Sequence, residues 1–247
     1  MNLSVVILTY NKWPELLPDC LESIIPQLRE GDELLVVDNG SEKPVPPSSQ
    51  YRLVRLPVNR GNVGGQNACL DVAKFKLILF VSDDVRLRGG CLKELVDFYE
   101  KRPYIRVQPV IHNPDGTIQN AGMDYRWPGY GISRMKFKST TTPIIASICY
   151  LTGSDRKFDE SLPMAYEDVD MSLRSNGLCG ICPTAHATHL GNATLSYTKK
   201  DRWRFHQARL QVIDKHFRGV DRWTRKLAVH IIDRIVNITR GALGRRT

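Results

Sequence analysis

Hydrophobic and polar positions follow a repeating pattern along the first hundred residues. Short runs rich in Val, Ile and Leu end abruptly in polar clusters, and stretches with a helical period of apolar residues follow them. Unbroken apolar runs of this length are typical of strands that are buried on both faces. Their alternation with helices predicts an α/β protein with a mostly parallel, right-handed doubly wound central sheet flanked by helices.

The second half of the chain is less regular than the first. It predicts a β-hairpin around the turn sequence Asn-Pro-Asp-Gly at 113–116, and an aperiodic loop at 126–142 that either borders an acceptor site or is a surface excursion. In chain order the predicted elements are strand Leu3–Leu8, helix Trp13–Leu28, strands Leu34–Val37 and Arg52–Leu56, helix Val63–Phe75, strand Leu77–Val81, helix Cys91–Lys101, strands Val107–Ile111, Thr117–Met123 and Pro143–Leu151, and helix Tyr166–Ser175.

Polar clusters close three of the predicted strands. Asn11 follows the first strand and Asp38 ends the second, whereas Asp83 and Asp84 come after the most apolar one. Because the carboxyl ends of parallel strands share one edge of a sheet, these side chains should converge there, where α/β folds bind nucleotides. Adjacent carboxylates at the end of a buried strand repel each other unless a cation lies between them. We expect Asp84, helped by Asp83, to hold a divalent metal; capping of the following helix is the alternative.

The segment near residue 170 carries further candidate chemistry. Glu167 and Asp168 fall in the first turn of a predicted helix, where they either complement the helix dipole or supply a general base. Asp170 lies four residues before Arg174, the spacing of an ordinary stabilising ion pair on a helix. His189 is a reasonable third metal ligand, although a lone histidine is more often structural.

The composition is that of a globular protein with a substantial core, because 42% of residues are hydrophobic and 25% are charged. No apolar stretch approaches the length of a membrane span, and the N-terminus lacks the charged-then-apolar pattern of a signal peptide. Six cysteines are scattered, and the pair Cys179 and Cys182 has no second pair to complete a zinc site. These features predict reduced thiols and a cytoplasmic location.

The formal net charge of +9 is concentrated at the C-terminal end. Residues 201–247 hold 12 Lys and Arg against 4 Asp, whereas the preceding residues hold 23 basic and 22 acidic side chains. The asymmetry predicts two parts with different partners, a body at 1–200 and a basic helical tail at 201–247.

The tail also has an apolar pattern. Leu227, Ile231, Ile235 and Ile238 repeat at helical spacing, and tryptophans stand among arginines. This pattern favours a basic amphipathic helix that lies on an anionic membrane surface, which would make the protein peripheral on the inner face of the cell membrane. The alternative is that these apolar residues pack on the body or on a second subunit, as in a homodimer.

Five motifs in order along the chain resemble those of the family 2 glycosyltransferases of the GT-A fold, and look most like the rhamnosyltransferase-type members that act in bacterial surface polysaccharide assembly. Any one motif is weak, but five in the family's order with sensible gaps are specific. The resemblance covers about Leu3 to Gly191. The motifs are VVILTYN at Val5–Asn11, VDNGS at Val37–Ser41, NRGNVGGQNA at Asn59–Ala68, VSDDV at Val81–Val85, and FDE followed by YEDVDMSLR, which ends at Arg174.

The resemblance implies roles for residues at the predicted sheet edge. Asp38 would accept the ring N–H of a pyrimidine base. Asp84 would contact the metal, and Asp83 would be shared between ribose and metal. Asp168 matches the catalytic base, with Glu167 as its neighbour in the same motif. The residues implied to line the nucleotide site are Thr9, Tyr10, Asn11, Asp38, Asn59, Gly61, Asn62 and Asp83.

These roles imply an inverting glycosyl transfer. Mn²⁺ or Mg²⁺ would neutralise the diphosphate leaving group of a UDP- or dTDP-sugar, so that the anomeric carbon can develop oxocarbenium character. Asp168 would deprotonate a hydroxyl of a glycan or lipid-linked acceptor, which attacks from the opposite face. A single displacement of this kind needs no second carboxylate as a nucleophile.

Two other classes of protein compete with this interpretation. A nucleotidyltransferase of related fold also needs carboxylates and a metal, but the sequence 9–13 is not the Gly-rich phosphate loop expected after its first strand. A nucleic-acid-binding protein would use the basic tail, but it would leave the acidic cleft without a purpose. We therefore expect no nucleic-acid partner.

Overall fold

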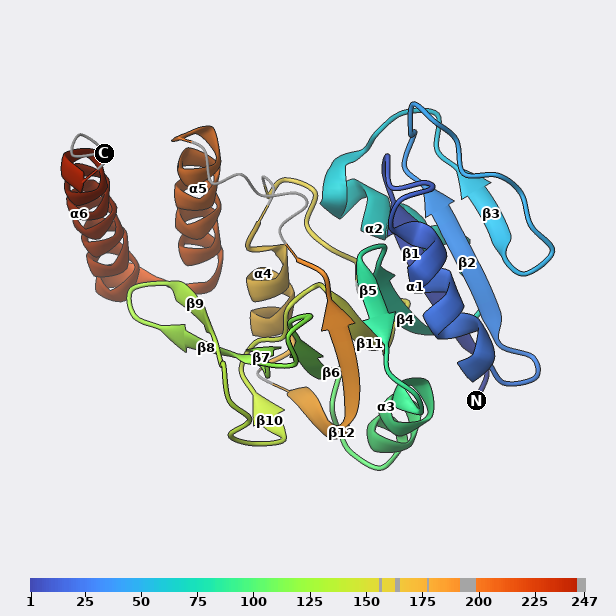
Figure 1. Ribbon diagram of the computed structural model, residues 1–247. Coiled ribbons are helices and arrows are strands. Elements are labelled where there is room, and N and C mark those ends of the chain that lie inside the picture. Colours follow the sequence, from blue (N-terminus) through green and yellow to red (C-terminus); the bar gives the residue numbers. More distant parts are fainter. Residues whose placement is uncertain (156, 163–164, 177, 192–198, 244–247) are drawn as a thin grey trace.

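The computed structural model describes residues 1–155, 157–162, 165–176, 178–191 and 199–243, with only the backbone at 199–201 and 236–243. They form a central sheet covered by helices, with two long helices at the C-terminal end (Figure 1). In chain order the elements are β1 (Leu3–Thr9), α1 (Leu17–Ile24), the 3-10 turn η1 (Ile25–Gln27), β2 (Glu33–Asp38), β3 (Arg52–Arg55), α2 (Gly61–Val72), β4 (Leu77–Ser82), β5 (Val85–Leu87), α3 (Cys91–Glu100), β6 (Arg106–His112), β7 (Ile118–Asn120), β8 (Met123–Arg126), β9 (Tyr130–Ser133), β10 (Thr141–Thr142), β11 (Cys149–Gly153), α4 (Glu167–Arg174), β12 (Cys179–His189), α5 (Lys199–His216) and α6 (Gly219–Leu243).

The main path of the central sheet has the strand order β10-β12-β6-β11-β4-β1-β2-β3. Its strands β3, β2, β1 and β4 run parallel, as the alternation of strands and helices predicts. β11 runs antiparallel to both of its neighbours, β4 and β6, and β5 pairs antiparallel with the end of β12. The predicted α/β class with a mostly parallel central sheet is confirmed. β6 and β12 of the second half also run parallel, but β11 separates them from the parallel strands of the first half.

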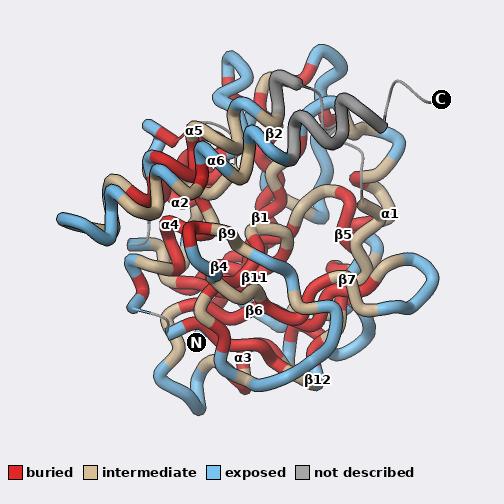
Figure 2. The backbone as a smooth tube through the Cα atoms, turned by 90° about the vertical axis from the view of Figure 1, so that its left-hand side faces the viewer, coloured by how far each residue is buried: buried red, intermediate tan, exposed pale blue. Residues whose placement is uncertain are grey.

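Helices on both faces of the sheet explain why its strands are unbroken apolar runs. Along β1, Val5 and Ile7 pack in the core that includes α1 and α3, whereas Val6 packs in the core that includes α2. Since neither face meets water, apolar side chains are favoured at every position of the strand. Figure 2 shows the inner strands as buried and the exposed positions on helices and loops.

The predicted helix Trp13–Leu28 is shorter in the structure because prolines act at both of its ends. α1 begins at Leu17 with Pro18 in its first turn, where the missing N–H has no intrahelical partner to lose. Pro26 cannot donate to the carbonyl four residues earlier, and the α-helix gives way to a single 3-10 turn.

Two segments of the second half differ from the prediction. The interval 126–142, expected to be a loop, contributes most of the hairpin formed by β8 and β9, whose turn at 127–129 carries a Pro-Gly turn signal. The predicted strand Pro143–Leu151 begins only with β11. Before it, Ile144 forms an isolated bridge with Met123 of β8, and the next two backbone N–H groups donate to side chains. The Ala146 N–H, for example, donates to Oε1 of Gln108 at 2.8 Å.

The C-terminal residues form two helices rather than one (Figure 1). α6 begins at Gly219, whose φ of 55° is a conformation that glycine adopts without strain. The two helices pack together through buried apolar side chains that include Ile213 and Val229. None of the helices in the described part of the chain combines the length and the apolar character needed to cross a bilayer.

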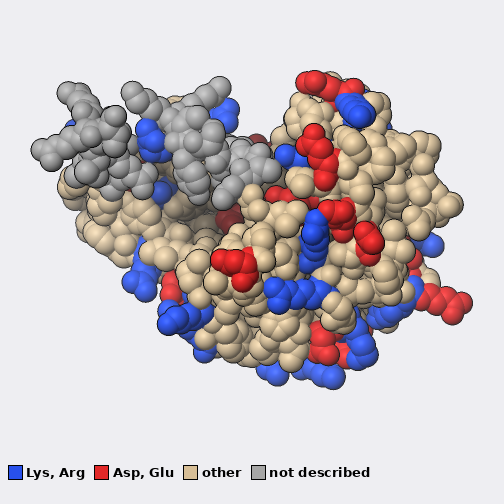
Figure 3. Space-filling view, in the orientation of Figure 1, with Lys and Arg blue, Asp and Glu red and all other residues tan. Residues whose placement is uncertain are grey.

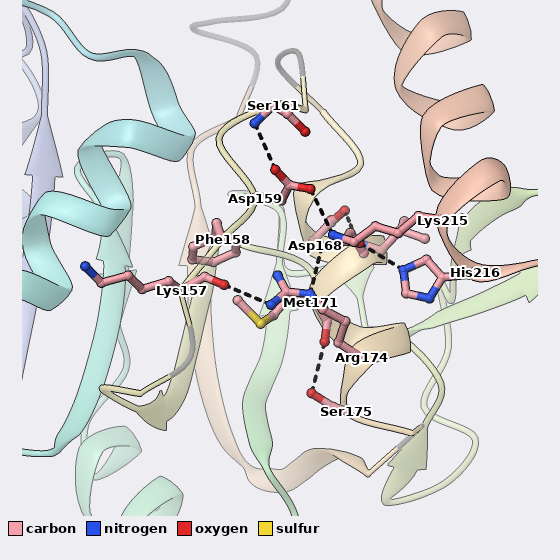
Figure 4. A network of polar contacts seen from close by, with 12 residues as sticks. Lys157, Phe158, Asp159, Ser161, Asp168, Met171, Arg174, Ser175, Lys215 and His216 are labelled. Carbon is pink, nitrogen blue, oxygen red and sulfur yellow. Dashed lines mark hydrogen bonds and ion pairs between the residues drawn. The ribbon is translucent and has the colours of Figure 1, made fainter.

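Asp170 of α4 joins the helix α5 to the body, in a polar network that includes Arg174, Lys215 and His216 (Figure 4). Its buried carboxylate pairs with Arg174 at 2.9 Å, as the sequence spacing predicts, and also with Lys215 at 2.8 Å and His216 at 2.9 Å from α5. Burial alone would raise the pKa of Asp170, but hydrogen bonds from His216 and Lys215 hold it below its ordinary value. α5 therefore packs on the body, whereas the apolar residues Leu227, Ile231 and Ile235 of α6 stay exposed.

Candidate active site

Strand registers bring the predicted nucleotide residues to one edge of the sheet. Thr9 at the end of β1 stands opposite Asp38 at the end of β2, and Leu8 stands opposite Ser82 at the end of β4. Asp83 follows Ser82, so it lies beside Thr9 at this edge. Figure 3 shows a group of Asp and Glu side chains near the middle of the view. The predicted convergence is confirmed for β1, β2 and β4.

Burial changes the protonation of Asp83. It raises the pKa of this carboxyl to about 6, and the charge of Asp84 acts in the same direction. The Thr9 hydroxyl and the positive charge of Lys12 offset part of the effect. A nearby divalent cation, or hydrogen bonds from neutral hydroxyls such as those of a ribose, would each stabilise the ionised form of such a carboxyl.

Asp84 and His189 meet beside the same edge. The pairing of β5 with β12 sets His189 opposite Val85, the residue after Asp84. The Nε2 atom of His189 lies 3.1 Å from a carboxylate oxygen of Asp84, and both side chains are largely buried. Within the described residues, no three His, Cys, Asp or Glu side chains are grouped closely enough to hold a metal by themselves. Protein side chains would therefore supply only part of a metal's coordination.

The neighbours of His189 favour one imidazole tautomer. The Gln119 amide donates through Nε2 to Oδ1 of Asn113 at 3.0 Å, which turns its Oε1 toward Nδ1 of His189 at 2.7 Å. An oxygen acceptor at Nδ1 favours a proton there, so Nε2 donates to Asp84 when the imidazole is protonated and is free to bind a metal when it is neutral. A nitrogen and a carboxylate oxygen facing each other in this way are stabilised by a shared cation. Mixed nitrogen and oxygen donors suit Mn²⁺ better than Mg²⁺, which prefers oxygen alone.

Asp38 lies at the predicted edge, but its carboxylate already has protein partners. It is fully buried, accepts the N–H of Ser41 at 2.9 Å, and receives the guanidinium of Arg55 at 2.7 Å. These contacts close the turn after β2. The assignment of Asp38 to a pyrimidine base stays a prediction, and it requires a base to share this carboxylate with Arg55.

The loop before α2 is anchored by Asn39, a residue that the sequence analysis did not single out. The Asn39 amide donates to Oδ1 of Asn59 and to the carbonyl of Gly61, both at 3.1 Å, while its Oδ1 accepts the N–H of Arg60 at 2.9 Å. Gly61 has a φ of 70°, and the space where a Cβ would stand is open. A backbone with this freedom and this exposure can approach a ligand closely.

Tyr10 and Asn11 border the site in different ways. Tyr10 is exposed at 38%, so its ring is available for stacking. The Asn11 side chain accepts the N–H of Glu42 at 2.9 Å, and its backbone N–H donates to the Ser41 hydroxyl. Asn11 therefore ties the end of β1 to the loop after β2, in addition to any contact with a nucleotide.

Glu167 is held firmly at the start of α4. Its Oε1 accepts hydrogen bonds from the Asn62 amide and the Ser147 hydroxyl, both at 2.9 Å, and only 6% of the residue is exposed. Ser147 adjoins Ile148, whose carbonyl accepts the N–H of Ser82 at 2.9 Å. The chain Ser82, Ile148, Ser147 and Glu167 thus links the end of β4, just before Asp83 and Asp84, to the first turn of α4.

Asp168 is the more accessible carboxylate of the second pair, since it is half-buried where Glu167 is buried. The surrounding protein and the charge of Glu167 raise its pKa to about 7, and the N–H of Val169 and the buried cation of Arg106 offset part of that rise. Because Glu167 is engaged by Asn62 and Ser147, Asp168 is the carboxylate better suited to accept a proton near neutral pH.

Comparison with known proteins identifies the family. The glycosyl transferase family 2 model matches residues 4–160, and the chain belongs to this family. A curated relative, the uncharacterized glycosyltransferase YwdF of Bacillus subtilis (strain 168), is 29% identical over 110 residues, which are 42% of this chain and 41% of the relative. The match therefore spans less than half of that relative.

Solved structures show the fold. The structure of GalNAc-T7 with UDP, GalNAc and Mn²⁺ matches with a TM-score of 0.69 at 14% identity, over 87% of this chain and 48% of that one. The structure of S. aureus TarS 1–349 in complex with UDP-GlcNAc matches with a TM-score of 0.63 at 17% identity, over 87% and 66%. The predicted GT-A fold and family are confirmed, and the chain carries a glycosyltransferase domain. The rhamnosyltransferase-like subtype stays a prediction.

Proposed function

We propose that this chain transfers a sugar from a nucleotide-diphosphate donor to a hydroxyl acceptor, with inversion at the anomeric carbon and with help from Mn²⁺ or Mg²⁺. The observation that carries the proposal is the meeting of two carboxylate pairs at one sheet edge, joined through Ser82, Ile148, Ser147 and Glu167. One pair suits a metal and a diphosphate, and the other suits a proton acceptor. The UDP in GalNAc-T7 and the UDP-GlcNAc in TarS support a nucleotide-sugar donor.

The residues that would hold the metal are Asp84 and His189, with Asp83 close by. Their donor atoms are a carboxylate oxygen and an imidazole nitrogen 3.1 Å apart. When bound, the metal would neutralise charge on the leaving diphosphate. Since these side chains leave coordination positions open, the donor's own phosphate oxygens would complete the shell. The Mn²⁺ in the GalNAc-T7 structure supports this assignment.

Asp168 would act on the acceptor. Its carboxyl, with a pKa of about 7, can take the proton from an attacking hydroxyl at neutral pH. Glu167 is fixed by hydrogen bonds from Asn62 and Ser147, and its charge helps to raise the pKa of Asp168. A single displacement with one base gives inversion, because the hydroxyl attacks the face opposite the leaving group.

The experiment that tests this proposal is a transfer assay with a panel of UDP- and dTDP-sugars and simple hydroxyl acceptors in Mn²⁺. Release of the nucleoside diphosphate together with a new glycoside would support the proposal, and NMR of the anomeric proton would report the stereochemistry. A retained configuration, or release of a sugar 1-phosphate with transfer of the nucleoside monophosphate, as in nucleotidyl transfer, would contradict it.

We also propose that the acceptor is linked to a lipid, and that the outward face of α6 binds the membrane that carries this lipid. Val220, Trp223, Leu227, Ile231 and Ile235 lie on one side of this helix and are between 45% and 78% exposed. They face away from Val229, which packs against α5. A row of apolar side chains with a tryptophan, on the part of the chain that carries most of the net charge, suits the surface of an anionic bilayer.

Liposome sedimentation tests the membrane proposal. Full-length protein should sediment with vesicles that contain phosphatidylglycerol, and Trp223→Ser with Leu227→Ser should reduce that fraction. Val58→Ser, which removes an equally exposed apolar side chain far along the chain, serves as the control. Unchanged sedimentation in the double variant, or a dimer in light scattering that the same double variant dissociates, would overturn the proposal in favour of a second subunit.

A further inference from the structure

One arginine of α5 connects four segments of the molecule. Arg209 is buried, and its Nε donates to the Tyr166 hydroxyl at 2.8 Å. Its NH1 atom donates to both carboxylate oxygens of Asp233 in α6, at 3.0 and 2.9 Å. The guanidinium also lies 3.9 Å from the ring centroid of Tyr130 in β9. The start of α4, the β8–β9 hairpin, α5 and α6 therefore share one cation.

Asp233 of α6 forms an ion pair with this guanidinium. Its carboxylate receives the Tyr130 hydroxyl at 2.9 Å and Nδ1 of His206 at 2.6 Å, in addition to Arg209. Burial alone would raise the pKa of Asp233, but the hydrogen bond from His206 and the charge of Arg209 hold it below its ordinary value. Two nitrogens of the Arg209 guanidinium thus donate to fixed acceptors, so the guanidinium has a defined position.

Tyr166, at the other end of this network, precedes the catalytic pair directly. Its φ is 67° and that of Ala165 is 96°, conformations that non-glycine residues rarely adopt. A backbone in this state persists only where its surroundings hold it there. The Arg209 hydrogen bond and the packing of Tyr166 with Val169 and Val212 supply that restraint. The conformation at 165–166 in turn sets the direction in which Glu167 and Asp168 enter α4.

We propose that Arg209 is a positioning residue for the carboxylate pair Glu167 and Asp168, acting through Tyr166. The C-terminal helices then belong to the catalytic unit, because α5 supplies Arg209 and α6 supplies the Asp233 that orients it. Lysine could not replace this arginine fully, since an ammonium has no planar fork to bridge a phenol and a carboxylate. This inference rests on the proposed base role of Asp168.

The test compares Arg209→Met, Arg209→Lys and Tyr166→Phe with the control Lys226→Met, which removes an exposed pair between Lys226 and Asp214 on the same two helices. In Arg209→Met we expect kcat to fall by roughly 10- to 100-fold with the donor KM nearly unchanged, since small misplacements of catalytic groups cost this much. Arg209→Lys should recover part of the loss. Tyr166→Phe should lower kcat less than Arg209→Met does. In the double variant it should lower kcat little further, because the hydrogen bond between Arg209 and Tyr166 is already absent in Arg209→Met.

Hydrogen exchange supplies a readout that does not depend on activity. Amides in the segment 165–174 should exchange faster in Arg209→Met than in Lys226→Met, while amides of β1 and β4 stay protected. If the wild type is active, equal kcat values in Arg209→Met and Lys226→Met would overturn this inference. Unchanged hydrogen exchange at 165–174 in Arg209→Met would overturn it as well. An inactive wild type would instead count against the proposed function, and the exchange result would still decide the role of Arg209.

Discussion

The side-chain amide of Asn62 donates a 2.9 Å hydrogen bond to Oε1 of Glu167, although 105 residues separate the two in sequence. The Gln66 amide donates to Oδ1 of Asn62 at 3.1 Å, which fixes the orientation of the Asn62 carboxamide. This contact joins the first turn of α2, where the sequence predicts a nucleotide contact, to the first turn of α4. Asn62 is therefore placed to position a catalytic carboxylate as well as to meet a donor.

Removing that contact should affect the catalytic step. In Asn62→Ala we expect kcat to fall by roughly 10- to 100-fold, because Glu167 loses one of its two donors and the carboxylate pair shifts. Asn62→Asp should be worse, since a second carboxylate would repel Glu167. Steady-state kinetics of donor and acceptor separately would measure this. A rise in donor KM with unchanged kcat would instead assign Asn62 to the nucleotide alone.

Loss of the imidazole at residue 189 should weaken metal binding. In His189→Ala, we expect the affinity for Mn²⁺ in the presence of UDP to fall by roughly 10- to 100-fold, because one donor atom beside Asp84 is gone. Titration calorimetry at pH 8 would measure it. His112→Ala, which changes another largely buried histidine outside the proposed metal site, is the matched control. Equal Mn²⁺ affinity in both variants would remove His189 from the metal site.

Removing the proton acceptor should stop chemistry without stopping binding. Asp168→Asn keeps the size of the side chain but cannot take a proton, so kcat should drop by roughly 10²–10⁴-fold. Binding of UDP, measured by calorimetry, should persist because the predicted nucleotide residues lie at the ends of β1, β2 and β4 and around the start of α2, and not on α4. Should Glu167→Gln be inactive while Asp168→Asn stays active, the two roles are reversed.

Because the pKa of Asp168 is raised, increasing the pH should raise the activity and lower the stability of the fold. Its pKa is raised to about 7 from an ordinary 3.8, so the acidic limb of the kcat profile should lie near pH 7. The raised pKa also means that ionising this carboxyl destabilises the fold. The free energy of unfolding should therefore decrease as the pH rises from about 4 to about 7. Asp168→Asn should therefore raise the unfolding temperature relative to wild type at pH 8 but not near pH 4. The exposed Glu15→Gln should show no such pH-dependent difference.

The sequence predicted the parts of the site that follow from strand order. The ends of β1, β2 and β4 could be aligned in advance, because parallel strands carry their carboxyl ends to one edge. Asp83, Asp84 and Asp168 were found in this way or through the family motifs. His189 was predicted only as a third metal ligand, and the pairing of β12 with β5 brings it beside Asp84.

The sequence could not predict contacts that depend on side chains meeting across the fold. Ser147 and Arg209 lie outside the family motifs, and Asn39 lies in VDNGS without an assigned role. The contacts of all three arise from long-range pairing between loops and helices. Asp38 was correctly assigned to the edge, but its pairing with Arg55 on β3 could not be read from spacing. The Asp170–Arg174 pair was predicted from helical spacing alone, whereas its extension to Lys215 and His216 required the packing of α5.

The most direct test of the central claim is a thermal-shift panel of UDP- and dTDP-sugars, each with Mn²⁺ and with EDTA, on wild type and Asp84→Asn. The account predicts that at least one nucleotide sugar raises the unfolding temperature of wild type in Mn²⁺, and that the increase is lost both in EDTA and in Asp84→Asn. No increase with any donor, or an increase that is equal in Mn²⁺, in EDTA and in Asp84→Asn, would contradict a metal-assisted nucleotide-sugar site at this sheet edge.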